Sequence, residues 1–327
     1  MINDSRRINY LRISVTDRCN FRCVYCVPSN PFNVITHDKI ARYEEILRIT
    51  QMATEMGITK VRITGGEPFA RKGIMDFLEQ LCALDRLEDI SITTNGALLN
   101  ERKLQHLLDF GIRRLNFSLD TLDPDKFEKI TRRDDFYKVK KNILMAHEMG
   151  ISPIKINTVI LRGLNDDEIE KIVRLTYRYP FHIRFIEYMP MGDSPIEKQK
   201  QVLTREIKEI IEAEYGLLAP VKQGMNDGPA KKFKLKDASG VVGFITPISS
   251  HFCSSCNRLR LTSRGTLRPC LLHNYERDIL TPLREGATDQ DLKQIIVETL
   301  EKKPAFHNLN NRSVKDIPIS HMTSIGG

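Results

Sequence analysis

"YLRISVTDRCNFRCVYC", residues 10–26, joins a β-prone run to three closely spaced cysteines. Its first residues alternate between apolar and polar side chains, which is the period of a strand with two different faces. Cys19, Cys23 and Cys26 follow directly, with the spacing C-x3-C-x2-C. A first strand that leads into three potential metal ligands predicts a site at the C-terminal edge of a sheet.

Five further β-prone runs follow along the chain, separated by amphipathic helical stretches: KVRIT (60–64), DISITT (89–94), RLNFSL (114–119), IKINTVI (154–160) and HIRFIEY (182–188). Six β/α units in series predict an α/β fold with a parallel sheet and helices packed outside it. Right-handed crossovers then leave a barrel or a doubly wound sheet, and periodicity alone does not separate the two. In both, the site lies at the C-terminal ends of the strands.

The pattern changes after about residue 200, where one helix is followed by an irregular, β-rich region. We therefore expect two domains, 1–220 and 221–327, with the second a smaller module docked on the first. The formal net charge of +8 favours an anionic partner such as a nucleotide, a nucleic acid or an acidic lipid. Without a membrane-spanning run or an apolar leader, the sequence predicts a cytoplasmic protein.

Seven cysteines, an odd number, argue against a disulfide framework in a reducing compartment. Cys82 follows a helical apolar pattern and is expected in the core. The others form two groups of three, the second being Cys253, Cys256 and Cys270. Structural zinc sites have four protein ligands, whereas an iron–sulfur cluster held by three thiolates keeps one iron open. From spacing alone, zinc with His251 as a fourth ligand stays open for the second group.

The pattern C-x3-C-x-aromatic-C after a first strand, with TGGEP (64–68) after the second, resembles the radical S-adenosylmethionine enzymes. Within that class, the motifs SSHFCSSCNRLRL (249–261), RFIEYMPMG (184–192) and the terminal SIGG (324–327) resemble the GTP 3′,8-cyclases of molybdenum cofactor biosynthesis. The resemblance covers nearly the whole chain. It implies an incomplete (βα)6 TIM-like barrel whose open side is closed by a C-terminal cluster-binding region.

The resemblance also implies two 4Fe–4S clusters, S-adenosyl-L-methionine, and conversion of GTP to 3′,8-cyclo-7,8-dihydro-GTP by a 5′-deoxyadenosyl radical. It assigns Cys19, Cys23 and Cys26 to the first cluster, Cys253, Cys256 and Cys270 to the second, Tyr25, Gly66, Ser118 and Met189 to S-adenosylmethionine, Arg12, Arg62, Thr93, Lys155, Arg258, Leu259 and Arg260 to GTP, and Gly326 and Gly327 to a tail that enters the site. Implied partners are a flavodoxin- or ferredoxin-like electron donor and cyclic pyranopterin monophosphate synthase. We expect a monomer or homodimer, without a nucleic acid or membrane partner.

Physical reasoning supports this assignment at two places. Arg12, Arg62 and Lys155 lie on proposed strands between apolar neighbours, so all three point to the same side and line a positive lumen suited to a triphosphate. Gly65 and Gly66 allow the backbone to approach a ligand closely.

Two alternative functions are weighed against this one. A radical S-adenosylmethionine enzyme with an auxiliary cluster could modify a peptide or RNA, and would carry more C-terminal cysteines. A zinc-stabilised nucleic-acid-binding module would suit the basic charge, but it leaves GGEP unexplained. The chain also lacks an aromatic-rich basic stripe and has no Trp.

Overall fold

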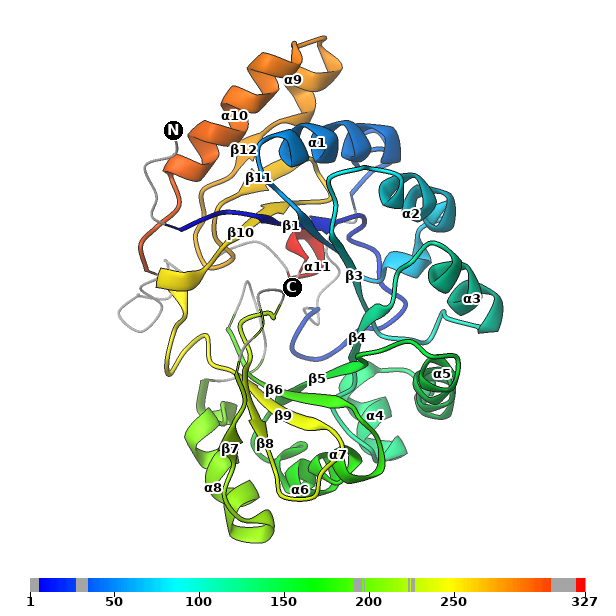
Figure 1. The fold of residues 1–327 in the computed structure, drawn as a ribbon, viewed down its shortest axis with the longest axis vertical. Helices are drawn as coiled ribbons and strands as arrows, with labels where there is room; N and C mark the ends of the chain where they lie inside the picture. Colours follow the sequence, from blue (N-terminus) through cyan, green and yellow to red (C-terminus); the bar gives the residue numbers. More distant parts are fainter. Residues whose placement is uncertain are drawn as a thin grey trace.

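The computed structural model describes residues 6–27, 35–190, 196, 198–222, 224, 227–306 and 322–326. One curved sheet dominates the described chain, and its central strands run parallel in sequence order (Figure 1). These strands are β1 (Tyr10–Ser14), β2 (Lys60–Thr64), β3 (Asp89–Thr94), β4 (Arg114–Ser118), β5 (Lys155–Ile160) and β6 (His182–Glu187). They match the six runs expected from the sequence.

Strands from the C-terminal region extend both edges of this sheet. Parallel strands are added at each side, and antiparallel hairpins continue outward, in the order β12-β11-β10-β1-β2-β3-β4-β5-β6-β9-β8-β7. The added strands are β7 (Ala219–Pro220), β8 (Lys231–Lys234), β9 (Val241–Ile245), β10 (Arg258–Leu261), β11 (Thr266–Arg268) and β12 (Arg277–Asp278). The loop between β9 and β10, which carries Cys253 and Cys256, joins the two edges.

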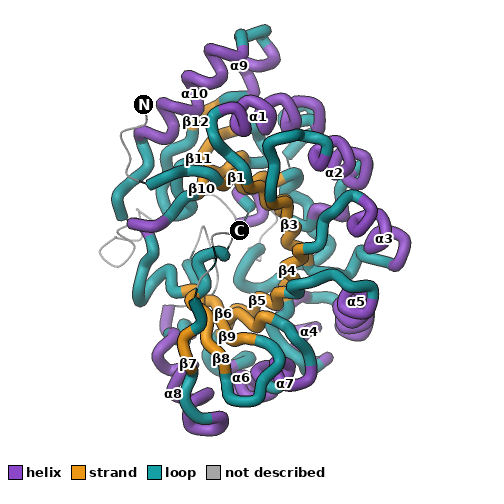
Figure 2. The backbone as a smooth tube through the Cα atoms, in the orientation of Figure 1, coloured by secondary structure: helices purple, strands orange, loops and turns teal. Residues whose placement is uncertain are grey.

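Among the described residues β9 and β10 do not pair, so the sheet forms an open barrel (Figure 2). The prediction of an incomplete TIM-like barrel is therefore confirmed, and the doubly wound alternative is wrong. The expected domain boundary near residue 220 stays a prediction. Segments on both sides of residue 220 belong to the same sheet.

Helices surround the sheet on its outer side (Figure 1). They are α1 (Tyr43–Glu55), α2 (Ile74–Cys82), α3 (Glu101–Asp109), α4 (Pro124–Thr131), α5 (Phe136–Glu148), α6 (Ile169–Val173), α7 (Leu175–Arg178), α8 (Thr204–Tyr215), α9 (Leu280–Arg284) and α10 (Asp289–Glu301), with 3-10 turns at Pro68–Ala70, Asp166–Glu168, Lys198–Lys200 and Cys253–Ser255. The short α11 (Met322–Ile325) instead lies inside the barrel, near its centre (Figure 1). None of the helices in the described part is long and apolar enough to cross a bilayer.

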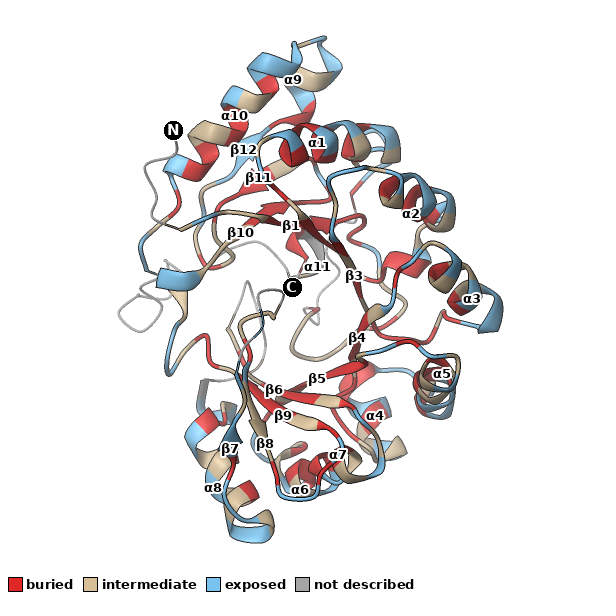
Figure 3. Cartoon of the chain, viewed as in Figure 1, coloured by how far each residue is buried: buried red, intermediate tan, exposed pale blue. Residues whose placement is uncertain are grey.

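The core lies between the sheet and these helices, where Figure 3 shows the buried sides of both. Leu11, Ile13, Val61 and Ile63 are fully buried there, while their neighbours Arg12 and Arg62 face the lumen. Strand alternation thus separates an apolar outer face from a polar inner face. Cys82, expected in the core, is partly buried and packs against it.

Candidate active site

The first cysteine loop follows β1 and is fixed by backbone hydrogen bonds. Its last turn closes through the amide of Cys26, which donates to the carbonyl of Cys23 at 2.9 Å. The amides of Arg22 and Val24 donate to the carbonyls of Thr131 and Ile130, both at 2.9 Å. The end of α4 therefore holds the loop in place from outside.

The GGEP motif meets this loop through backbone contacts. The Gly66 amide donates to the Thr16 carbonyl at 2.7 Å, and the Glu67 amide donates to the Arg18 carbonyl at 2.9 Å. A Cβ on Gly66 would lie 2.3 Å from the Arg18 carbonyl oxygen. The Gly66 backbone therefore lies directly against the segment that precedes Cys19, a close approach that glycine allows.

Glu67 connects the loop to the end of β3. Its Oε1 accepts hydrogen bonds from the Phe69 amide at 3.1 Å and the Thr94 hydroxyl at 2.8 Å, and its Oε2 accepts one from the Asn95 amide at 2.7 Å. The Asn95 side chain then donates to Asn20 Oδ1 at 2.8 Å. Burial raises the pKa of Glu67 to about 7, and these donors oppose that rise.

The three cysteines line one cavity, which we call the first cavity. Of the residues assigned to S-adenosylmethionine, Tyr25, Gly66, Ser118 and Met189 all line it as well. Burial raises the pKa of Cys19 to about 11 and that of Cys26 to about 12. Such buried thiols become thiolates when a cationic centre binds them, because the metal compensates the buried charge.

Asp120 is a member of the first cavity that sequence reasoning missed. The Tyr25 hydroxyl donates to its Oδ2 at 2.6 Å, and the Val159 amide donates to its Oδ1 at 2.8 Å. Burial raises the pKa of Asp120 to about 6. Its position in the sequence could have indicated this role. Asp120 follows the C-terminal end of β4, and the site of such a barrel lies at the C-terminal ends of its strands.

Cys253, Cys256 and Cys270 line a neighbouring cavity, the second cavity, together with a group of arginines. These are Arg12, Arg62, Arg184, Arg258 and Arg260, contributed by β1, β2, β6 and β10. Arg184 was not among the predicted residues, although the alternation in HIRFIEY places it inward between buried Ile183 and Phe185. Burial, then Arg258, lowers the pKa of Arg260 to about 10, as expected for crowded cations.

Two residues assigned to GTP lie outside this cavity. Leu259 is fully buried in the outer core, opposite Leu11 in the sheet register, so the structure does not bring its side chain to the site. Strand alternation explains this, because Arg258 and Arg260 on either side point inward. Lys155 does face inward, but it lies deeper along β5 and is 1% exposed. The cations that act on its ammonium are Arg184, Arg114 and Arg62.

The two cavities are adjacent. Thr93, Asn157, Ile186 and Met189 line both of them. Among the described residues, Thr93 Oγ1 and Asn157 Oδ1 are buried without a hydrogen-bond partner. Buried polar atoms that lack a partner are costly, so these two point to ligands that satisfy them where the cavities meet.

The C-terminal tail reaches this junction. Arg260 Nη1 donates to the Gly326 carbonyl at 2.8 Å, and a Cβ on Gly326 would lie 2.5 Å from Thr64 Cγ2. Met322 lines the first cavity, and Ile325 packs with Leu272. Gly327, also assigned to the tail, lies outside the described residues.

Comparison with known proteins agrees with this arrangement. Residues 13–176 match the model of the Radical SAM superfamily, and residues 181–309 match that of Molybdenum Cofactor Synthesis C. A GTP 3′,8-cyclase of Syntrophomonas wolfei is 44% identical over 307 residues, which is 94% of each chain. One from Desulforamulus reducens is 46% identical over 310 residues, covering 94% of this chain and 95% of the relative.

The chain belongs to the GTP 3′,8-cyclase family, within the radical SAM superfamily. Among solved structures, Streptococcus suis SuiB bound to S-adenosylmethionine superposes with a TM-score of 0.63 at 16% identity, covering 93% of this chain and 68% of SuiB. At that identity the likeness shows the shared fold. Family membership does not favour the two alternatives, a radical S-adenosylmethionine enzyme that modifies a peptide or RNA and a zinc-stabilised nucleic-acid-binding module.

Glu187, at the end of β6, supports the second cysteine region of this family member. It is fully buried and accepts hydrogen bonds from the amides of Thr204, Ile248 and Ser249 at 3.0, 3.1 and 3.0 Å. Glu187→Ala leaves those buried amides without an acceptor, so we expect the free energy of unfolding to fall by about 3 kcal/mol.

Denaturant unfolding of the metal-free protein measures this change. Glu209→Ala is the matched control, because Glu209 makes an exposed ion pair with Arg205 on the nearby helix α8. That substitution should cost less than about 0.5 kcal/mol. Equal losses in the two variants would show that Glu187 has no special structural role.

Proposed function

We propose that this chain is a GTP 3′,8-cyclase that converts GTP to 3′,8-cyclo-7,8-dihydro-GTP, in the first step of molybdenum cofactor biosynthesis. The observation that carries the proposal is the pair of adjacent cavities, each lined by three cysteines, with five arginines in the second. Arginine binds phosphate through a bidentate fork, and a group of buried, crowded guanidinium groups needs an anionic ligand. A nucleoside triphosphate meets that need.

The first cavity suits a 4Fe–4S cluster with S-adenosylmethionine. Cys19, Cys23 and Cys26 provide three thiolates, and no fourth cysteine or histidine lines this cavity in the described part of the chain. When bound, the cluster and S-adenosylmethionine supply the 5′-deoxyadenosyl radical. Gly66, Ser118 and Met189 form the wall against which the cosubstrate binds, and Tyr25 is held in that wall by Asp120.

The second cavity holds the substrate and a second 4Fe–4S cluster on Cys253, Cys256 and Cys270. Burial raises the pKa of Cys256, but Arg258 and then Lys303 lower it, and the result is about 7. This cysteine therefore reaches the thiolate form more readily than those of the first loop. Thr93 and Asn157 lie where the two cavities meet, and their unpartnered buried oxygen atoms are placed to bind the ligands there.

The reaction consumes electrons, which we assign to a flavodoxin- or ferredoxin-like donor. Exposed arginines surround the first cysteine loop: Arg133 Nε donates to the Asn20 carbonyl at 2.8 Å, and Arg18 and Arg132 are exposed nearby in sequence. Such a basic surface favours an acidic partner. We place the enzyme in the cytoplasm as a monomer or homodimer, with cyclic pyranopterin monophosphate synthase taking the product.

Anaerobic reconstitution tests the cofactors first. Iron and sulfide analysis should find about eight irons per chain, as two 4Fe–4S clusters require. The reduced protein should then convert GTP and release 5′-deoxyadenosine when S-adenosylmethionine is supplied. Zinc without iron would refute the cluster assignment, and 5′-deoxyadenosine without loss of GTP would refute the substrate.

Binding of the triphosphate should take up a proton at Lys155. Burial, then Arg184, Arg114 and Arg62, lowers the pKa of Lys155 to about 6, so the free enzyme carries this amine mostly neutral near pH 7. A triphosphate stabilises the ammonium and raises that pKa. Affinity should therefore be highest below about pH 6 and fall as the pH rises toward the pKa of the complex.

Calorimetry of GTP binding in two buffers of different ionisation enthalpy measures this uptake. Lys155→Met should reduce the uptake, whereas Lys231→Met, at the exposed first residue of strand β8, should preserve it. An uptake that Lys155→Met leaves unchanged would assign the proton to another group.

A further inference from the structure

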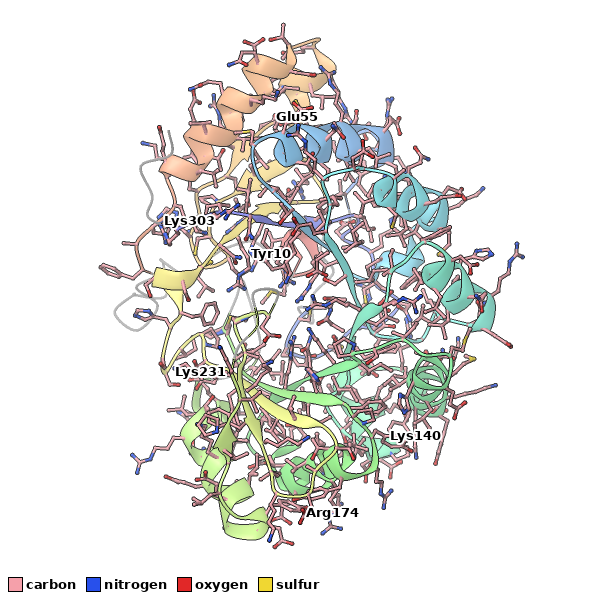
Figure 4. All side chains as sticks on the ribbon, viewed as in Figure 1. Tyr10, Glu55, Lys140, Arg174, Lys231 and Lys303 are labelled. Atoms are coloured by element: carbon pink, nitrogen blue, oxygen red, sulfur yellow. The ribbon has the colours of Figure 1, made fainter. Side chains whose placement is uncertain are left out.

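A buried ammonium lies behind the second cavity. Lys303 follows α10, is 8% exposed, and donates from Nζ to the carbonyls of Arg258 at 2.7 Å and Pro269 at 2.6 Å. Within the described ranges, no Asp or Glu forms an ion pair with it. Figure 4 shows Lys303 at the end of α10, on the side toward β10. A buried cation without a carboxylate needs another negative partner.

Its contacts connect the segments that carry the second group of cysteines. Arg258 lies two residues after Cys256, and Pro269 directly precedes Cys270. Arg6 completes the connection, because its Nη1 donates to the Cys253 carbonyl at 3.2 Å and its Nη2 donates to the Lys303 carbonyl at 3.2 Å. Lys303 therefore contacts the segments of Cys256 and Cys270 directly, and Arg6 connects it to the segment of Cys253.

The position of Lys303 identifies its partner. Its two acceptor carbonyls belong to the segments that carry Cys256 and Cys270, and both cysteines line the second cavity. Thiolates on a metal centre in that cavity supply the negative charge that compensates the buried ammonium.

We propose that Lys303 is a positioning residue for the second iron–sulfur cluster, which fixes the Arg258 and Pro269 segments and raises the reduction potential of the cluster. The proposal rests on the proposed function, since it requires that cluster. A fixed positive charge beside an anionic cluster stabilises the reduced state more than the oxidised state, because the reduced state carries one more negative charge. Uncharged hydrogen bonds to the Arg258 and Pro269 carbonyls would fix the same segments without raising the reduction potential of the cluster.

The test measures the second cluster by itself, in the full-length chain with Cys19, Cys23 and Cys26 replaced by alanine. The midpoint potential is followed by electron paramagnetic resonance during a redox titration. Lys303→Gln keeps an amide donor and removes the charge, so its potential should shift to a more negative value. Lys303→Arg keeps the charge and should stay close to the parent.

Lys302→Met is the matched control, because it removes the same charge from the exposed neighbouring residue. It should leave the potential unchanged. Lys303→Met, which removes both charge and donors, should also lower the iron bound by the parent, about four per chain, by at least half. Metal-free unfolding curves of each variant separate cluster loss from a folding defect.

A Lys303→Gln potential equal to that of the parent would overturn the proposal. If Lys303→Gln binds too little iron to titrate, recovery of iron in Lys303→Arg supports it, and equally poor binding in Lys303→Arg overturns it. A parent chain that takes up zinc or no metal instead refutes the proposed function, and that result is visible before any Lys303 variant is made.

Discussion

Gly66→Ala is expected to abolish 5′-deoxyadenosine formation. The added Cβ would lie 2.3 Å from the Arg18 carbonyl oxygen, 2.5 Å from the Arg18 carbonyl carbon and 2.9 Å from the Asp17 carbonyl oxygen. These neighbours are backbone atoms, so they cannot rotate away as a side chain would. Relief requires movement of the segment directly before Cys19, which also breaks the hydrogen bonds from Gly66 and Glu67.

Iron analysis after reconstitution should therefore fall from about eight to about four per chain, because only the second cluster remains. Gly57→Ala is the control, since a Cβ there meets nothing within 4 Å while φ is +101°. It should cost about 1 kcal/mol of stability through its backbone conformation and leave the iron content intact. Full iron content and normal 5′-deoxyadenosine formation in Gly66→Ala would contradict the packing argument.

Much of this barrel could be predicted from the sequence because strand and helix periods are local. The same period of two that predicts Arg12 and Arg62 on the lumen side also places Arg184 there, and it turns Leu259 into the outer core. Arg184 was missed, and Leu259 was included, because the site residues were taken from the family resemblance and not from strand alternation. Alternation applied to each residue would have included Arg184 and placed the Leu259 side chain in the core.

Other features carry no local signal. Lys303 lies in a short basic run directly after α10, and its burial follows from how α10 packs against α1 and β11. The contact of Gly66 with Arg18 likewise depends on β1 and β2 being neighbours in the sheet. Such contacts join residues far apart in the chain, so they require the three-dimensional arrangement. The exception is Asp120, which follows a strand end where polar residues were already expected.

Arg260→Ala is expected to weaken GTP binding by about 10²-fold while leaving both clusters in place. Arg260 is 4% exposed, lies opposite Arg12 in the sheet register, and lines the second cavity. Loss of one partner from a buried, charge-assisted contact costs about 3 kcal/mol, which corresponds to that factor. The same change removes the hydrogen bond to the Gly326 carbonyl, so the tail loses its contact with β10.

Two comparisons separate these effects. Arg264→Ala removes a charge from the exposed turn between β10 and β11, and it should leave GTP affinity within about twofold of the wild type, since exposed charges contribute little. Arg260→Lys keeps the charge but loses the bidentate fork, so its affinity should fall between those of the wild type and Arg260→Ala. Calorimetric titration of the reconstituted proteins with GTP measures all three. If Arg260→Ala binds GTP as tightly as Arg264→Ala does, Arg260 contacts the tail and not the triphosphate.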